Sequence, residues 1–230
     1  MSKIIDLFSR KKPAPAPQNG QVSYFLTGFS IEVMPRTAEK IEDFREILPA
    51  GTRVYIAHIE GTPIEDMLAT AKRIAGEGFP VMPHFPARGI ASKAQLAEWI
   101  AMYRGEAGID QALLLAGGYD APTGDFDNSM ELLESGLFAD FKRLHVAGHP
   151  EGNKDIDPDG GKANVSSALR WKQAFSETTD AEMAIATQFC FEAGPVIEWA
   201  DSSSAAVRVR VIPDLSSSSS LSKTAFFRKV

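Results

Sequence analysis

Short apolar segments recur along the chain and alternate with stretches whose apolar residues are spaced as on one face of a helix. The apolar segments have the length of buried strands. In the stretches between them, apolar residues recur every three to four residues, as on one face of a helix. Strands that alternate with helices predict a parallel sheet with helical crossovers. Seven apolar segments begin near Phe29, Arg53, Phe79, Gln111, Arg143, Ala181 and Val207.

Two arrangements of such a sheet are open: a doubly wound open sheet and a (β/α)8 TIM-type barrel. Polar residues follow the carboxyl ends of many segments, which favours the barrel because all its strand ends converge on one mouth. An open sheet would concentrate such residues at one or two switch points. No G-x-G-x-x-G pattern follows a strand, which argues against a Rossmann dinucleotide site. The polar residues are Glu32, His58, His84, Arg88, Asp120, His149, Glu151 and Gln188.

The sixth segment, 184-AIATQFCF-191, predicts what lies inside the barrel. Its small residues and Gln188 share one face, and its large apolar residues share the other. An amide that points inward beside alanines leaves room for a ligand, or it is satisfied by neighbouring strands. The inward set is Ala184, Ala186, Gln188 and Cys190, and the outward set is Ile185, Thr187, Phe189 and Phe191.

The end of the chain departs from a complete barrel. After the seventh segment only 216-SSSSSLSKTAFFRKV-230 follows, so we expect no normal eighth strand and a truncated or altered C-terminus. Three regions are predicted: a flexible lead-in over 1–20, a single β/α barrel domain over 21–215, and a serine-rich tail over 216–230.

Composition limits the function classes. The chain has 230 residues, 44% of them hydrophobic, and a net charge of −6. This charge argues against a general binder of nucleic acid or membrane surfaces, and no run approaches the ~20 apolar residues of a membrane span. A single cysteine suits a reducing compartment, so we expect a cytoplasmic protein. An organellar targeting peptide at the basic N-terminus stays an alternative.

Two acidic residues are candidates for chemistry. Glu32 sits within the first strand, where burial would raise the pKa of a carboxyl group and suit it to general acid catalysis. The alternative is a structural carboxylate bonded to a neighbouring lysine or arginine. Asp120 follows Gly117 and Gly118, which allow a close backbone approach to a ligand or a positive φ. The alternative there is an ordinary turn.

Other polar residues give weaker signals. Lys172, in a predicted helix, is either a solvated lysine or a phosphate contact. The four histidines are dispersed, so no metal site is predicted. The run 155-DIDPDG-160 matches the start of an EF-hand loop, but the twelfth position would be Ser166 instead of glutamate. We interpret this run as an acidic loop.

Taken together, six segments resemble the methylenetetrahydrofolate reductase family of flavoproteins, in its short, bacterial-type form that contains the catalytic barrel alone. The segments occur in the family's order and span about residues 25–200. They are 30-SIEVMP-35, 83-PHFPAR-88, 113-LLLAGGYD-120, 146-VAGHPEGN-153, 169-LRWK-172 and 186-ATQFCF-191.

The resemblance implies a (β/α)8 barrel that holds FAD at its carboxyl-terminal mouth without a Rossmann motif. It implies hydride transfer from NAD(P)H to FAD and then to 5,10-methylenetetrahydrofolate, giving 5-methyltetrahydrofolate. The implied partners are these small molecules, with a homo-oligomer left open. The cofactor would carry the chemistry and the protein would orient it.

The resemblance also implies roles for single residues. Glu32 matches an acidic residue that helps to protonate the folate and open its one-carbon bridge. Asp120 matches an aspartate near the flavin pyrimidine ring and the pterin, whose charge favours a cationic iminium. Gln188 matches a glutamine that contacts the stacked substrate. The implied cofactor-binding positions are His84, Gly117, Gly118, Asp120, His149, Asn153 and Lys172.

Some positions depart from the family's pattern. His149 stands where many members have tyrosine, Asn153 where many have histidine, and Gly117 and Tyr119 replace an arginine-glycine pair. These departures and the unusual C-terminus leave a second hypothesis open, a non-catalytic or partner-completed homologue that binds flavin or folate. A third, an unrelated barrel enzyme such as an aldolase, lacks a lysine at an apolar strand end.

Overall fold

The computed structural model describes residues 28–188, 193–202 and 208–210. The predicted lead-in over 1–20, the predicted tail over 216–230 and Cys190 lie outside these residues. Within them, seven parallel strands form one sheet, which confirms the predicted α/β class. The strands are β1 Ser30–Val33, β2 Arg53–Ile56, β3 Val81–Pro86, β4 Gln111–Leu115, β5 Arg143–Gly148, β6 Glu182–Thr187 and β7 Arg208–Arg210.

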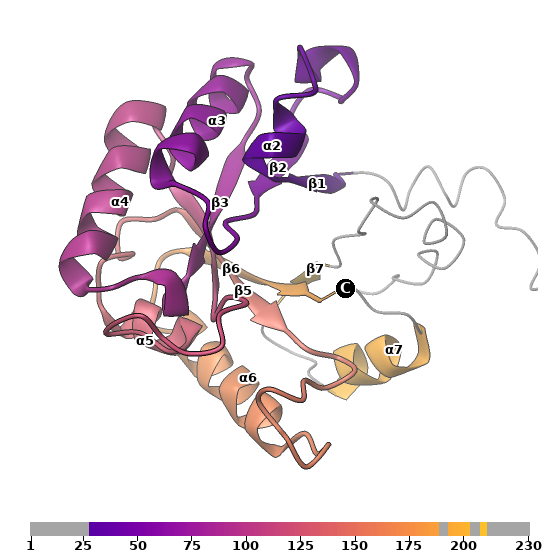
Figure 1. Ribbon diagram of the computed structural model, residues 1–230. Coiled ribbons are helices and arrows are strands. Elements are labelled where there is room, and N and C mark those ends of the chain that lie inside the picture. Colours follow the sequence, from indigo (N-terminus) through magenta and orange to yellow (C-terminus); the bar gives the residue numbers. More distant parts are fainter. Residues whose placement is uncertain (1–27, 189–192, 203–207, 211–230) are drawn as a thin grey trace, which may run out of the picture.

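Helices connect the strands and lie along the outer side of the sheet (Figure 1). Within the described residues, no helix is both long and apolar enough to cross a bilayer. The α-helices are α2 Pro35–Ala38, α3 Ile64–Gly76, α4 Lys93–Ala107, α5 Ser129–Glu134, α6 Ala163–Ser176 and α7 Ala193–Ser202. Two short 3₁₀ helices are η1 Phe44–Glu46 and η2 Ala87–Gly89.

The strands follow one another in sequence order from β1 to β7. A doubly wound sheet reverses its order at a switch point, so the order of the described strands does not fit a doubly wound sheet.

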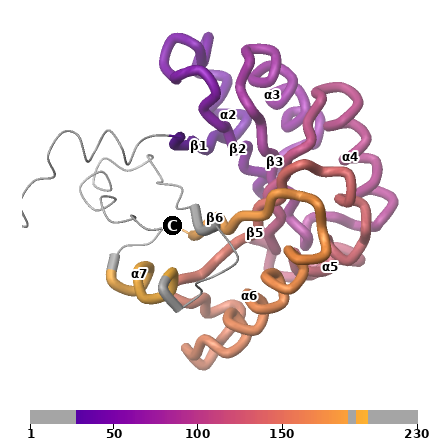
Figure 2. Tube along the Cα trace, turned by 180° about the vertical axis from the view of Figure 1, so that it is seen from behind, coloured from indigo at the N-terminus to yellow at the C-terminus, as the bar shows by residue number. Residues whose placement is uncertain are grey.

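A contact across the sheet shows that the sheet curls. The Tyr55 hydroxyl on β2 lies 2.6 Å from Nδ1 of His145 on β5, although β3 and β4 stand between these strands. In a flat sheet β2 and β5 would be about 14 Å apart, three times the usual strand spacing. Tyr55 and His145 can therefore meet only across a strongly concave face, and the curl is visible from both sides (Figures 1 and 2).

The two faces of the sheet carry different residues. On the convex face, Val54, Phe85 and Ile185 belong to the main core under the helices. On the concave face, a smaller apolar cluster contains Tyr55 and Ala186. The predicted division of the sixth strand, with Ile185 outward and Ala186 inward, is confirmed. Large groups pack under the helices, whereas the concave side carries polar groups beside the buried apolar residues Met82 and Leu113.

The side chain of Asn128 caps the N-terminus of α5. Oδ1 of Asn128 accepts hydrogen bonds from the backbone N–H groups of Met130 and Glu131 at 3.0 and 3.2 Å. The Glu131 carboxylate accepts from the N–H of Asp127, one residue before the cap. The cap therefore fixes the end of the long loop that follows β4.

Gly148 ends β5 at a point where no side chain fits. A Cβ atom there would lie 2.4 Å from Cγ2 of Ile185 and 3.1 Å from the Trp199 ring. We expect Gly148→Ala to lower the free energy of unfolding by about 1–3 kcal/mol because of overpacking. Gly105→Ala in α4, where nothing lies within 4 Å, should instead stabilise by about 0.5–1 kcal/mol. Urea unfolding of both variants checks this, and an equal effect of the two would contradict it.

Candidate functional site

The residues predicted to act all lie near the carboxyl ends of the parallel strands. Because these ends share one edge of the curled sheet, the fold gathers residues that are far apart in sequence. Glu32 and His84 lie on β1 and β3, and Lys172 lies on α6. The remaining predicted residues follow β4, β5 and β6: Gly117, Gly118, Asp120, His149, Asn153 and Gln188.

Glu32 and His84 face each other across the concave side. Oε2 of Glu32 lies 3.1 Å from Nε2 of His84, which is within ion-pair distance. The two groups are not aligned for a straight hydrogen bond. The His84 side chain is 10% exposed and that of Glu32 is 46% exposed. The prediction that Glu32 is buried is therefore wrong, since the carboxyl group lies near the open end of the hollow.

This exposure changes the chemistry that Glu32 can perform. An exposed carboxyl group can reach a ligand, and His84 lies within ion-pair distance of it. The partner is a histidine instead of the lysine or arginine of the structural alternative. The concave side thus holds a carboxyl group beside an imidazole.

The loop after β4 places Asp120 at the surface. Gly117 has φ = +97°, a left-handed conformation that glycine adopts without strain. Its missing side chain also leaves room for Pro86, whose Cβ would lie 2.9 Å from a Cβ at Gly117. Asp120 is exposed two residues beyond Gly118. Gly117 therefore adopts the positive φ that the sequence allows, and the bend is followed by the exposed carboxylate.

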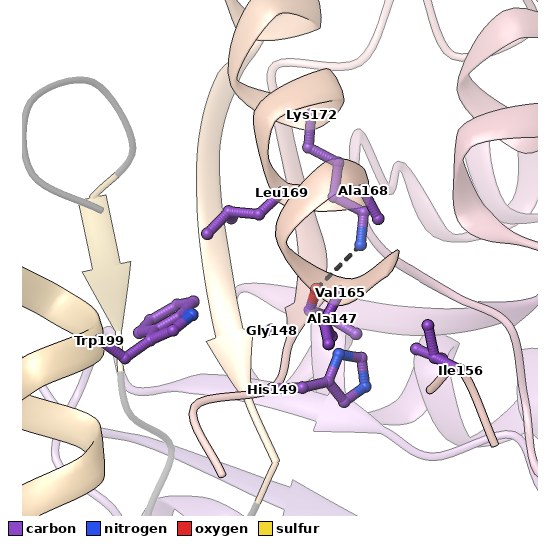
Figure 3. A pocket seen from close by; sticks show the side chains of 9 residues that line it. All are labelled: Ala147, Gly148, His149, Ile156, Val165, Ala168, Leu169, Lys172 and Trp199. Atoms are coloured by element: carbon purple, nitrogen blue, oxygen red, sulfur yellow. Dashed lines mark hydrogen bonds between the residues drawn. The ribbon is translucent and has the colours of Figure 1, made fainter. Parts of the chain in front are cut away.

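Lys172 and His149 share a small pocket between β5, α6 and α7 (Figure 3). The Lys172 side chain is buried, and its Nζ donates a hydrogen bond of 2.9 Å to the carbonyl oxygen of Ala147. The solvated alternative for this lysine is therefore wrong. The pocket is small and partly open, and it is lined by Ala147, Gly148, His149, Ile156, Val165, Ala168, Leu169, Lys172 and Trp199.

The pocket changes the acid–base properties of both residues. Burial lowers the pKa of Lys172 from 10.5 to about 8. Burial, and then the positive charge of Lys172, lowers the pKa of His149 from 6.5 to about 4. A desolvated cation beside a neutral imidazole is suited to an anionic group, because an anion would restore the lost stabilisation of the charge.

The lowered pKa of His149 predicts that the folded protein becomes less stable in acid. Between pH 6.5 and 4 the unfolded chain protonates His149 whereas the folded chain does not, so stability falls as the pH falls through this window. The contribution has an upper bound of about 3 kcal/mol. We expect His149→Gln to lose less stability than the unaltered chain between pH 6.5 and 4, measured by urea unfolding. An identical loss would contradict the assignment.

The other predicted residues have mainly local contacts. The backbone N–H of Gln188 donates to the Gly148 carbonyl oxygen at 3.0 Å, which joins the ends of β6 and β5, and its side chain is exposed. Oδ1 of Asn153 accepts from the N–H of Asp155 at 2.9 Å. This amide oxygen therefore stabilises its own loop.

The acidic run 155–160 stabilises the start of the helix that follows it, α6. The buried carboxylate of Asp157 accepts hydrogen bonds from the N–H groups of Asn164 and Val165 at 2.8 and 3.0 Å. These are N–H groups of the first turn of α6, which a carboxylate satisfies well. Among the described residues, no group of three or more His, Cys, Asp or Glu side chains could hold a metal ion.

No family model matches the chain.

Two residues of the concave face were not predicted from the sequence. Tyr55 and His145 make the contact across the sheet. His58, which the sequence places after the second strand, donates a hydrogen bond of 3.0 Å from Nε2 to the Thr62 carbonyl oxygen, and its ring lies 5.0 Å from that of Trp99. Tyr55 and His145 occupy alternate, inward positions of predicted strands, so period-two alternation is the signal that could have found them.

Proposed function

We propose that the protein catalyses the FAD-dependent reduction of 5,10-methylenetetrahydrofolate to 5-methyltetrahydrofolate with NAD(P)H. The observation that carries the proposal is the Glu32–His84 pair on the concave side of the sheet, with the Glu32 carboxyl group exposed. Asp120 and Gln188 follow β4 and β6 at the same end of the sheet. A proton donor and a negative charge at one mouth are what this reduction requires from the protein.

We also propose that the curled parallel sheet is part of a (β/α)8 barrel. It is supported by the parallel strands in sequence order and by the contact between Tyr55 and His145 across the concave face. In such barrels the ligand binds at the carboxyl-terminal mouth, which is where the candidate residues gather.

The residues present fit FAD. Lys172 is a buried cation whose described hydrogen bond goes to a neutral carbonyl group, so an anionic phosphate would complement its charge. The Lys172 amine points toward the end of β5, which His149 follows (Figure 3). The pocket itself has room for only about two water molecules, so a phosphate would contact Lys172 from the open side of the pocket, and the rest of FAD would lie along the concave side of the sheet. FAD would supply hydride transfer between the nicotinamide and the folate.

The protein's own residues would handle protons and charge. Glu32 would donate a proton to the folate nitrogen whose bond to the bridging carbon breaks, leaving a cationic iminium at the other nitrogen. The Asp120 carboxylate would stabilise this cation. The balanced reaction consumes one hydride from NAD(P)H and one proton, and forms one methyl group. Gln188 would orient the stacked substrate.

The direct test is product analysis. The full chain is incubated with FAD, 5,10-methylenetetrahydrofolate and either NADH or NADPH, and the folates are separated by mass. We expect 5-methyltetrahydrofolate to form in proportion to the nicotinamide oxidised. Oxidation of nicotinamide without this product would remove the folate from the proposal.

One observation favours the second hypothesis, a non-catalytic homologue. The Asn153 amide oxygen, at a position carried over as flavin-binding, is bonded within its own loop. Titration with FAD separates the two hypotheses, because a homologue that has lost the site would not bind it. Cytoplasmic location is proposed together with the folate function.

A further inference from the structure

The loop that carries Asp120 is fastened at several points to a short segment beyond β3. The N–H of Arg88 donates to the Ala116 carbonyl oxygen at 2.9 Å. The carbonyl oxygen of Arg88 accepts from the N–H and the hydroxyl of Thr123 at 2.8 and 2.9 Å. Arg88 thus contacts both the start and the middle of residues 116–128.

The guanidinium group of Arg88 adds contacts on both sides of Asp120. Nη1 donates to the carbonyl oxygen of Tyr119 at 3.2 Å. Nε donates to Oδ1 and to the carbonyl oxygen of Asp127 at 2.7 and 3.2 Å. The contact with Tyr119 is partly buried, whereas those with Asp127 lie at the surface.

The packing of Tyr119 fixes the same peptide from its other side. A Cβ atom at Gly89 would lie 2.6 Å from the Tyr119 hydroxyl, and one at Gly117 would lie 3.1 Å from the ring. The ring therefore rests on two glycines. The residue directly before Asp120 is held by its carbonyl group and by its side chain.

The structure assigns to Arg88 the role of positioning residue for Asp120. This inference rests on the proposed function, in which the Asp120 carboxylate stabilises a cation at the mouth. Asp120 itself is exposed, so its direction depends on the backbone that carries it. Arginine is needed because two nitrogens of one planar group reach two different places on the loop. Lysine, with a single charged nitrogen, cannot make both contacts.

The test uses the full chain with added FAD and compares Arg88→Met and Arg88→Lys with the unaltered protein. Asp127→Asn weakens the same link from the loop side. Arg104→Met is the matched control, because Arg104 pairs with Asp140 on the surface, at 3.1 Å and away from the loop. Two readouts are taken: amide hydrogen exchange over residues 117–126, and the rate at which the folate reoxidises reduced flavin.

We expect about tenfold faster exchange of the loop amides in both Arg88 variants and a smaller increase in Asp127→Asn. Arg104→Met should leave the loop unchanged. Strand amides of β3 and β4 report whether a variant is folded. If Arg88→Met proves unstable, Arg88→Lys decides, because it keeps the charge and loses only the forked contact.

A double substitution tests whether Arg88 acts through Asp120. Arg88→Met should slow flavin reoxidation by about tenfold in the unaltered chain and have no further effect in an Asp120→Asn chain. Equal slowing in both backgrounds, or unchanged loop exchange, would overturn the inference. If the unaltered chain does not pass hydride to the folate at all, the proposed function fails, and loop exchange alone then decides whether Arg88 holds the loop.

Discussion

Replacing Glu32 with glutamine is expected to slow reduction of the folate by about 10²- to 10⁴-fold, the usual contribution of a general acid. Glutamine has nearly the same shape but cannot give up a proton. Reduction of FAD by NAD(P)H needs no proton from this carboxyl group, so it should keep its rate. Stopped-flow measurement of the two half-reactions separates these effects.

The control for this variant is Glu39→Gln, which removes an exposed carboxylate just after α2. It should leave both half-reactions unchanged. Unchanged folate turnover in Glu32→Gln would remove Glu32 from the acid role. Equal loss in both half-reactions would instead indicate that Glu32 serves the flavin site.

Replacing Lys172 with methionine is expected to weaken FAD binding by about 10- to 100-fold, the value of a hydrogen bond to a charged group. Methionine fills similar space and removes the cation. Fluorescence titration of the flavin measures the change. The exposed pair of Lys72 and Glu106 provides the control, since Lys72→Met should not alter FAD binding.

The Lys172→Met variant should also change how the free energy of unfolding depends on pH. With a pKa of about 8 in the folded chain and 10.5 when unfolded, Lys172 binds more protons in the unfolded state between these values. Stability of the FAD-free protein should therefore rise with pH from 8 to 10.5, by at most about 3 kcal/mol. Lys172→Met should lack this rise. Equal pH dependence of the two proteins in urea unfolding would show that Lys172 is solvated.

The parts of the fold that depend on local patterns could be predicted from the sequence. The strand starts at Arg53, Gln111 and Arg143 agree with the structure, because short apolar runs between helical stretches leave few alternatives. The Asn128 cap was predictable because its partners lie within three residues. The bend at Gly117 was predictable because glycine adopts a positive φ.

The parts that depend on contacts across the sheet could not be predicted. The exposure of Glu32 follows from how far the sheet curls, and the burial of Lys172 follows from how α6 and α7 approach β5. Neither property follows from the spacing of apolar residues within one segment. The link from Arg88 to Asp127 joins residues 39 apart in sequence, and no pattern in either segment predicts it.

A visible absorption spectrum of the full chain with FAD, recorded under argon before and after NADH or NADPH is added, tests the central claim most directly. The account predicts a protein-bound flavin spectrum that bleaches with the nicotinamide and returns when 5,10-methylenetetrahydrofolate is added. A protein that takes up no FAD would contradict the account, and so would a bound flavin that the folate cannot reoxidise.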